Sequence, residues 1–366
     1  MMKMMMMMMM MMSGPLIVLL LQLLFLLNVV KGEAVQPTFD EFQGLFSRSY
    51  ADENEKLRRE RTYNENLEKI RKLNSAPGSA VFRVNAFADL STDEFRAQYL
   101  LPNAGLKRLL EMRRRRAQPG RAKGAVDFNV TKIPSGKSWY MHATTAVRDQ
   151  GQCGSCWGFS NVEQVESDWF LAKGVLEELS VQQLLDCDKE EAYGCGGTYA
   201  GGGSGYDYII SNHGLESEKA YPYVSGKTGV EQKCKAVPQK VAGGTIRNFS
   251  YAIPECYLPW DNCDNQDEQG IIQYLNSRGP LAVCVNARNW QFYHSGVLEG
   301  STCGGHSHAD LDHCVQLVGY ANMGTKNASY EIRNSWGTAW GNAGLISLAF
   351  GNNTCGVADT ASYTIV

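Results

Sequence analysis

The distribution of cysteine constrains the fold of this 366-residue chain more than any other feature. All eleven cysteines follow residue 150, and the first 150 residues contain none. Cysteines at this density are typical of a disulfide-linked domain in an oxidising compartment. Because the count is odd, at least one thiol is free or pairs between chains. We therefore expect a cysteine-free front part followed by a cross-linked domain.

The N-terminus has the layout of a secretory signal. Lys3 precedes an apolar stretch over residues 16–30, and the small residues Gly32 and Ala34 follow it. A membrane anchor would need about 20 apolar residues. We therefore expect residues 1–34 to be a signal peptide, with no membrane attachment once it is removed.

Residues 35–100 are predicted to form a small helical domain. The stretch 52–74 lacks Pro and Gly and is rich in Glu, Lys, Arg and Leu, which predicts one long, mostly exposed helix. Residues 81–84 predict a short strand. Ser91 and Glu94 have the spacing of a capping box and predict the start of another helix.

Residues 101–127 are predicted to be a linker. Its run Arg113–Arg116 is either a solvated charge patch or an exposed processing site. Residues 1–127 hold 20 basic and 14 acidic residues, whereas those from Phe128 onward hold 15 and 24. The two parts are therefore of opposite net charge and can attract each other. The total net charge of −3 gives no indication of nucleic-acid binding.

Residues 128–366 are predicted to be an α+β domain. Its first half offers helices over 155–172, from about Ser180, and over 205–212. Its second half alternates as strands do. These predicted strands span 281–285, 313–320, 330–333 and 345–349. A helical half followed by a strand-rich half favours two lobes.

The segment from Gln150 to Trp157 contains Cys-Gly-Ser-Cys-Trp and predicts a nucleophile. Cys156 opens a predicted helix, where free N–H groups and the helix dipole favour a thiolate. Gln150 lies six residues upstream and can donate its amide to a developing oxyanion. A bridged or buried structural cysteine is the plain alternative. A zinc site at Cys153 and Cys156 would need further ligands, which the cluster of His306, His308, Asp310, Asp312 and His313 could supply.

His313 and Asn334 are the predicted partners of this thiol. His313 begins a predicted strand, whereas His306 and His308 lie in a Gly-rich loop. Asn334 can accept a hydrogen bond from one imidazole N–H, which fixes the tautomer and leaves the other nitrogen facing the thiol. Trp336 is placed to cover the pair from water.

These motifs resemble the papain family of cysteine peptidases, in its cathepsin L-like branch. The front segment is similar to the propeptides of that branch, although Tyr63 stands where Phe is usual and Arg83 where Gly is usual. The matching residues of its two motifs are Glu55, Arg59, Tyr63, Asn66, Ile70 and Asn74, then Asn85, Phe87 and Asp89.

The resemblance implies a papain-like two-lobe fold, with a helical left lobe and a β-barrel-like right lobe, preceded by a helical inhibitory prodomain. It implies a cysteine endopeptidase made as an inactive precursor, with a catalytic group of Gln150, Cys156, His313 and Asn334. No cofactor or metal is implied. The expected partners are protein and peptide substrates and the chain's own propeptide, with no nucleic acid. We expect a monomer of the secretory pathway, in a lysosome or vacuole or outside the cell.

The resemblance also implies three disulfides, Cys153–Cys195, Cys187–Cys234 and Cys303–Cys355. Cys256 and Cys263 are close enough along the chain for a local bridge. Cys284 and Cys314 fall at two walls of the main specificity pocket, either bonded or as thiols. The expected substrate-binding residues are Gly196, Gly197, Cys284, Asp312, Cys314 and Trp336, with Gly201-Gly202 as an alternative glycine wall. Glycosylation sequons begin at Asn129, Asn248, Asn327 and Asn352.

Overall fold

The computed structural model describes residues 36–101, 133–189, 194–197, 205–237, 240–256 and 263–366. The predicted signal peptide, nearly all of the predicted linker, Asn129 and Gly201-Gly202 lie outside these residues. Within them, no helix has the length and apolar character needed to cross a membrane. The chain divides into two compact units, Met1–Ser49 and Tyr50–Val366.

The described part of the first unit contains the helix α3 (Phe39–Leu45). Thr38 caps it, because the Thr38 hydroxyl accepts the Glu41 N–H while the Glu41 carboxylate accepts the Thr38 N–H. Phe39 and Phe42 are both buried, and their rings stack with centroids 6.1 Å apart.

The second unit begins with the pro-segment, which we define as residues 50–101. It contains α4 (Glu53–Ser75), β1 (Val81–Phe82) and α5 (Thr92–Tyr99). These elements confirm the predicted long helix, short strand and capping box. The buried Asn66 amide on α4 donates to the carbonyl oxygens of Ala88 and Leu90, at 2.9 and 2.8 Å, and so ties the helix to the loop before α5.

Arg83 continues the pairing of β1 with β5 (Tyr293–Ser295). Its N–H donates to the Phe292 carbonyl at 2.9 Å, and its φ angle is not positive. The backbone at this position therefore does not need the glycine that is usual in related propeptides.

The helical lobe is built around α7 (Cys156–Lys173), which ends at Gly174 in the left-handed conformation. Its buried core includes Trp157, Phe159, Val162 and Val165. The neighbouring helices are α8 (Val181–Cys187), α9 (Tyr206–Ser211) and α10 (Ser225–Thr228). Ser180 caps α8 by accepting the Gln183 N–H, as the sequence indicates.

The second lobe is an eight-stranded sheet whose main order is β3-β10-β4-β7-β8-β9-β6, with β2 paired to β7. Its strands match those expected near residues 281, 313, 330 and 345. The remaining helices are α11 (Glu268–Ser277) and α12 (Gly300–Cys303). The strand bounds are β2 Lys137–Ser138, β3 Asn248–Tyr251, β4 Leu281–Val285, β6 Val297–Leu298, β7 His313–Ala321, β8 Ser329–Arg333, β9 Leu345–Ala349 and β10 Ser362–Ile365.

The barrel-like lobe is an open sheet among the described strands, not a closed barrel. Closing it would require β3 to pair with β6, and the described strands show no such pairing. The strand β6 is only two residues long and runs parallel to β9, which leaves little backbone to close a barrel.

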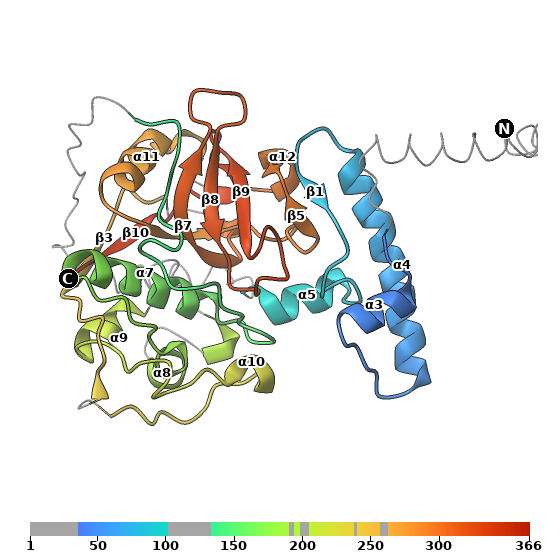
Figure 1. Ribbon diagram of the computed structural model, residues 1–366, viewed down its shortest axis with the longest axis horizontal. Coiled ribbons are helices and arrows are strands. Elements are labelled where there is room, and N and C mark those ends of the chain that lie inside the picture. The colour runs from blue at the N-terminus through green and yellow to red at the C-terminus, as the bar shows by residue number, and fades with distance from the viewer. Residues whose placement is uncertain (1–35, 102–132, 190–193, 198–204, 238–239, 257–262) are drawn as a thin grey trace, which may run out of the picture. The chain divides into compact units, whose positions relative to one another are not determined.

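The helix α7 packs against β7, and this contact joins the two lobes (Figure 1). The Ser160 hydroxyl on α7 donates to the Val315 carbonyl on β7 at 2.9 Å. The helix that begins at Cys156 and the strand that begins at His313 are therefore held side by side.

All eleven cysteines lie in the described residues, and ten of them form five disulfides. The bridges are Cys153–Cys195, Cys187–Cys234, Cys256–Cys263, Cys284–Cys314 and Cys303–Cys355. Of the two states left open for Cys284 and Cys314, the structure has the bonded one. Cys156 is the free thiol.

Candidate active site

Cys156 is the first residue of α7 and is fully buried. Burial raises the pKa of its thiol to about 12, although the N–H groups of Cys314 and Trp157 favour the thiolate. The contribution from the Cys314 N–H places the sulfur beside the residue that follows His313. With the pro-segment in place, the thiol is therefore neutral.

His313 is the first residue of β7, and Asn334 orients its ring. The imidazole Nε2–H donates to Asn334 Oδ1 at 2.7 Å, whereas Nδ1 is buried without a hydrogen-bond partner. Burial lowers the pKa of His313 to about 4, against the opposing effect of the Asn334 hydrogen bond. The ring of Trp336 covers the imidazole, with centroids 4.6 Å apart.

Gln150 presents its side-chain amide to the pro-segment. Its Nε2 donates to the carbonyl oxygens of Tyr99 and Cys153, at 3.1 and 3.0 Å. Its Oε1 accepts from the Ser335 hydroxyl at 2.8 Å and from Trp336 Nε1 at 3.1 Å, which fixes the amide orientation. The pro-segment carbonyl of Tyr99 thus occupies one donor of the Gln150 amide.

The pro-segment contacts the same site through its backbone and its aromatic rings. The Leu101 N–H donates to the Asp312 carbonyl at 2.6 Å. The rings of Phe87, Phe95 and Tyr99 contact Trp336, with centroids 5.9, 5.2 and 6.4 Å away. The pro-segment rings therefore pack on Trp336, which in turn lies against the buried His313 ring.

The other predicted substrate-binding residues fall in two places. Cys284 and Cys314 are paired residues of β4 and β7, so their bridge lies next to His313. Gly196 and Gly197 follow Cys195, which is bonded to Cys153 beside the nucleophile. Asp312 directly precedes His313, and the Trp336 ring lies against the His313 imidazole.

Sequence reasoning missed Tyr223, Ser335 and Gln291. The Tyr223 hydroxyl donates to the Gln150 carbonyl at 2.7 Å, and the Ser335 hydroxyl holds the Gln150 amide. Gln291 donates to the Phe87 carbonyl of the pro-segment at 3.0 Å. Ser335 could have been found as part of the Asn334 motif, whereas nothing in the sequence points to Tyr223 or Gln291.

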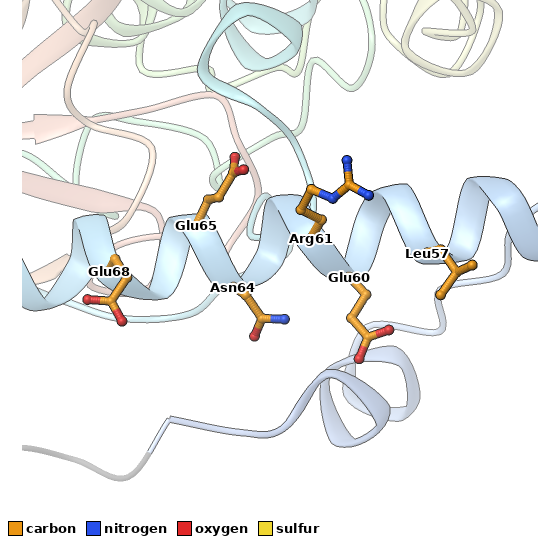
Figure 2. A pocket seen from close by; sticks show the side chains of 6 residues that line it. All are labelled: Leu57, Glu60, Arg61, Asn64, Glu65 and Glu68. Atoms are coloured by element: carbon orange, nitrogen blue, oxygen red, sulfur yellow. The ribbon is translucent and has the colours of Figure 1, made fainter.

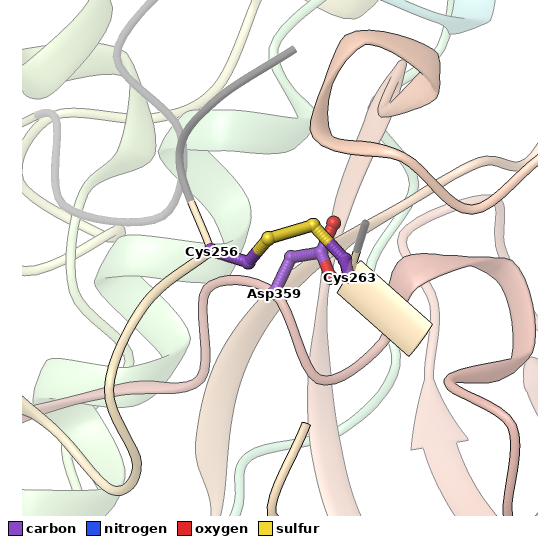
Figure 3. Close-up of side chains that lie close together, drawn as sticks. All are labelled: Cys256, Cys263 and Asp359. Atoms are coloured by element: carbon purple, nitrogen blue, oxygen red, sulfur yellow. A yellow bond between two sulfur atoms is a disulfide. The ribbon is translucent and has the colours of Figure 1, made fainter. Parts of the chain in front are cut away.

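A metal at this site finds no support in the predicted alternative ligands. His308 lies in a short 3-10 turn, His308–Asp310. Cys153, which a zinc site would need beside Cys156, is bonded to Cys195. A second cluster joins Cys256, Cys263 and Asp359 within 4.8 Å (Figure 3). Both of its sulfurs form a disulfide, so they are not available as thiolate ligands.

A cavity on α4 is also unsuited to catalysis. Figure 2 shows the six α4 side chains that line it, of which five are polar and carry mixed charges. They are Leu57, Glu60, Arg61, Asn64, Glu65 and Glu68. None of the predicted site residues is among them.

Comparison with known proteins agrees with this geometry. The family model "Papain family cysteine protease" matches residues 133–365. The chain belongs to the papain family of cysteine proteases. A second model, "Cathepsin propeptide inhibitor domain (I29)", matches residues 39–95. The protein is therefore a cysteine protease that carries an inhibitory propeptide.

Curated relatives match over nearly the whole chain. Cysteine proteinase 1 of Dictyostelium discoideum is 36% identical over 359 residues, covering 90% of this chain and 93% of the relative. Cathepsin L1 of Drosophila melanogaster is 33% identical, covering 94% and 90%.

Solved precursors share the fold. Procathepsin L2 of Tenebrio molitor has a TM-score of 0.73 at 27% identity, covering 90% of this chain and 98% of that one. The stem bromelain precursor has a TM-score of 0.71 at 29% identity, with 90% and 97% covered. The papain-like fold with a propeptide is thereby confirmed.

Proposed function

We propose that Cys156, His313, Asn334 and Gln150 form the catalytic site of a cysteine endopeptidase. The observation that carries this proposal is the position of the Tyr99 carbonyl, which accepts a hydrogen bond from the Gln150 amide. A peptide carbonyl thus already lies at the donor suited to an oxyanion, beside a free thiol and an oriented imidazole.

Release of the pro-segment starts the reaction cycle. Water then reaches the buried pair, and a proton moves from Cys156 Sγ to His313 Nδ1. The thiolate attacks the peptide carbonyl carbon, and the oxyanion accepts hydrogen bonds from the Gln150 amide and the Cys156 N–H. His313 returns the proton to the leaving amine, and an acyl thioester remains on Cys156.

Hydrolysis of the thioester completes the cycle. His313 takes a proton from water, and the hydroxide attacks the thioester carbonyl. The carbon–sulfur bond then breaks, the acid product leaves, and Cys156 regains its proton. Asn334 keeps the Nδ1 side of the imidazole toward the sulfur through both steps.

The Cys284–Cys314 bridge is proposed as one wall of the main specificity pocket, with Asp312, Trp336 and the Gly196-Gly197 segment as further substrate contacts. The Leu101 N–H bond to the Asp312 carbonyl supports this, because a substrate backbone N–H can make the same bond. Replacing both sulfurs (C284V/C314A) should change the ranking of peptides with different apolar side chains. Removing the Cys187–Cys234 bridge serves as the control.

The proposed location is the secretory pathway, ending in a lysosome or vacuole or outside the cell, and the proposed state is a monomer. The signal-like N-terminus and the five disulfides support this location. The proposed domain limits are 1–34, 35–100, 101–127 and 128–366, and N-terminal sequencing of the secreted precursor and of the processed protein tests them.

A thiol-reactive epoxide tests the catalytic assignment. After acid removal of the pro-segment, the protein should gain one label, located at Cys156 by mass spectrometry. The Cys156→Ser protein is the matched control and should gain none. A processed protein that cleaves no peptide and takes no label at Cys156 would instead be an inactive binding or inhibitory relative.

A further inference from the structure

The loop after β9 presents Asn352 on a fixed backbone. The buried Glu268 carboxylate accepts the N–H groups of Gly351 and Asn353, at 3.0 and 2.8 Å. Asn352 itself is exposed, and its side chain makes no hydrogen bond within the described residues. It is the first residue of the sequon Asn352-Asn353-Thr354, so a free acceptor amide is held in an ordered turn.

Asn352 also lines a cavity of about 700 Å³. Cavities that hold drug-sized ligands measure roughly 300–1,000 Å³, so this one has room for a few sugar rings. It is lined by the pro-segment turn Pro77-Gly78 and by residues of the protease domain that include Glu299, His306 and Phe350. Polar groups together with an aromatic ring suit a sugar, which has hydroxyl edges and an apolar face.

The cavity adjoins the contact where the pro-segment joins the protease domain. A Cβ added at Gly78 would lie 3.5 Å from Glu299 Cγ, so the two walls nearly touch there. The Ser79 hydroxyl accepts the Val297 N–H at 3.0 Å and donates to the Val297 carbonyl at 3.3 Å. A group that fills the cavity would therefore hold the Pro77-Gly78 turn in place.

We propose that Asn352 carries an N-linked glycan whose first sugars fill this cavity and hold the pro-segment turn against the protease domain. In the attachment step, the Asn352 Nδ2 forms a bond to the anomeric carbon of a lipid-linked oligosaccharide. The lipid pyrophosphate leaves, and the amide loses one proton. The inference rests on the proposed passage through the secretory pathway, where this donor is found.

Asn327 is a matched control for this proposal. It begins the sequon Asn327-Ala328-Ser329 and is exposed on the loop between β7 and β8. It does not line the cavity. If Asn327 carries a glycan, the chain has entered the secretory pathway, so a bare Asn352 would overturn this inference and leave the proposed location intact.

The first measurement is the rate at which a peptide:N-glycan amidase removes each glycan from the folded, full-length precursor. Mass spectrometry detects each removal as a conversion of Asn to Asp. We expect the Asn352 glycan to be released more slowly than the Asn327 glycan, and both to be released alike after the pro-segment is removed. Equal release rates in the precursor, or no glycan at Asn352, would overturn the proposal.

The second measurement compares maturation of the precursor variants N352Q and N327Q at acid pH. Because the glycan stabilises the docked turn, N352Q should mature about two- to tenfold faster than N327Q, which corresponds to the loss of about one hydrogen bond. The mature proteases should have equal activity. Equal maturation rates would contradict the proposal even if Asn352 is glycosylated.

Discussion

Two buried polar clusters share the helix α7 and the end of β8, and they differ in how they carry charge. The reaction centre contains no ion pair, because burial lowers the pKa of His313 to about 4 and raises that of Cys156 to about 12. The second cluster, which we call the arginine cluster, contains two arginines that face carboxylates. Its members are Arg148, Glu163, Glu166 and Arg333.

The members of the arginine cluster face one another at short range. Arg333 Nη2 lies 3.3 Å from Glu163 Oε2, and Arg148 Nη2 lies 3.0 Å from Glu166 Oε1. Burial lowers the pKa of Arg148, but Glu166 and Glu163 outweigh this and leave the pKa above its ordinary value. Burial raises the pKa of Glu163 to about 7 despite both arginines, so Glu163 is the member that protonates first.

In both clusters burial favours the neutral form of a group, and in the arginine cluster the facing charges oppose this effect. The cover of the reaction centre includes Tyr99 and Phe95 of the pro-segment, whose rings contact Trp336. None of the four members of the arginine cluster belongs to the pro-segment. We therefore expect changes in the first cluster to alter activity and changes in the second to alter stability.

The largest expected effect is on the arginine cluster. Arg333→Met would leave Glu163 facing one arginine fewer inside the protein, which should lower the free energy of unfolding by about 3–5 kcal/mol. Urea denaturation of the precursor at pH 7.5 measures this loss. Arg247→Met removes an exposed arginine and is the matched control.

The double variant R333M/E163Q tests whether unpaired charge is the cause. It should regain a substantial part of the lost stability, because no buried carboxylate then lacks its partner. A double variant as unstable as R333M alone would show that the arginine acts by filling space, and the contrast between the clusters would fail.

The second prediction concerns pH. The pKa of His313 is lower in the folded precursor than in the unfolded chain, so the unfolded chain binds more protons between about pH 6.5 and 4. The stability contributed by the neutral imidazole is thus present above pH 6.5 and is lost as the pH falls. The unfolding free energy of the parent, relative to His313→Gln, should decline by up to about 3 kcal/mol across this window.

Glu163→Gln provides the opposite sign in the same experiment. The pKa of Glu163 is raised to about 7, so its contribution is lost as the pH rises from about 4.5 to 7. Measured against Glu163→Gln, the parent should therefore lose stability with rising pH. If the stability differences from His313→Gln and from Glu163→Gln change with pH in the same direction, the distinction between the clusters is refuted.

The third prediction concerns Asn334, which belongs to the reaction centre and directly follows Arg333 of the arginine cluster. Asn334→Ala removes the hydrogen bond to the imidazole, which is charged during the reaction. The loss of about 1.5–3 kcal/mol corresponds to a roughly 10- to 150-fold fall in kcat/KM. Asn342→Ala, at an exposed position of the same connection between β8 and β9, should change kcat/KM by less than about twofold.

The sequence predicts the elements that carry the reaction centre because their signals are local. The Cys-Gly-Ser-Cys-Trp motif predicts the start of α7, and the capping box at Ser91 and Glu94 predicts α5. The alternation of apolar residues predicts β7 with His313 as its first residue. In each case, the determining contacts lie within about one turn of helix or a few strand residues.

Contacts between distant parts of the chain could not be predicted in this way. Glu163 has the sequence context of an exposed helix position, and its partner Arg333 is 170 residues away. The helix α11 and the strand β10 are buried by tertiary packing, and their short patterns were not predicted. The sequence also could not tell whether the sheet closes into a barrel, since this depends on which strands become edges.

Gly158 shows how packing reverses a local expectation, and it gives the smallest predicted effect. Helix propensity alone suggests that Ala would stabilise α7 by about 1 kcal/mol. A Cβ at this position would, however, lie 2.8 Å from Leu185 Cδ1 and 3.3 Å from Val181 Cγ1 on α8. The Leu185 side chain is buried and has little room to move, so Gly158→Ala should destabilise the precursor by up to about 1 kcal/mol.

The position of Gly158 between the two clusters makes this variant informative. It lies on α7 after Cys156 and before Glu163, so a shift of the helix would displace both. The midpoint temperature of thermal unfolding and kcat/KM should then both fall by a small amount. Relief of the contact by Leu185→Ala in the same chain should restore kcat/KM. A stabilised Gly158→Ala precursor would instead show that α8 yields to the helix, and that α7 holds the two clusters without help from this contact.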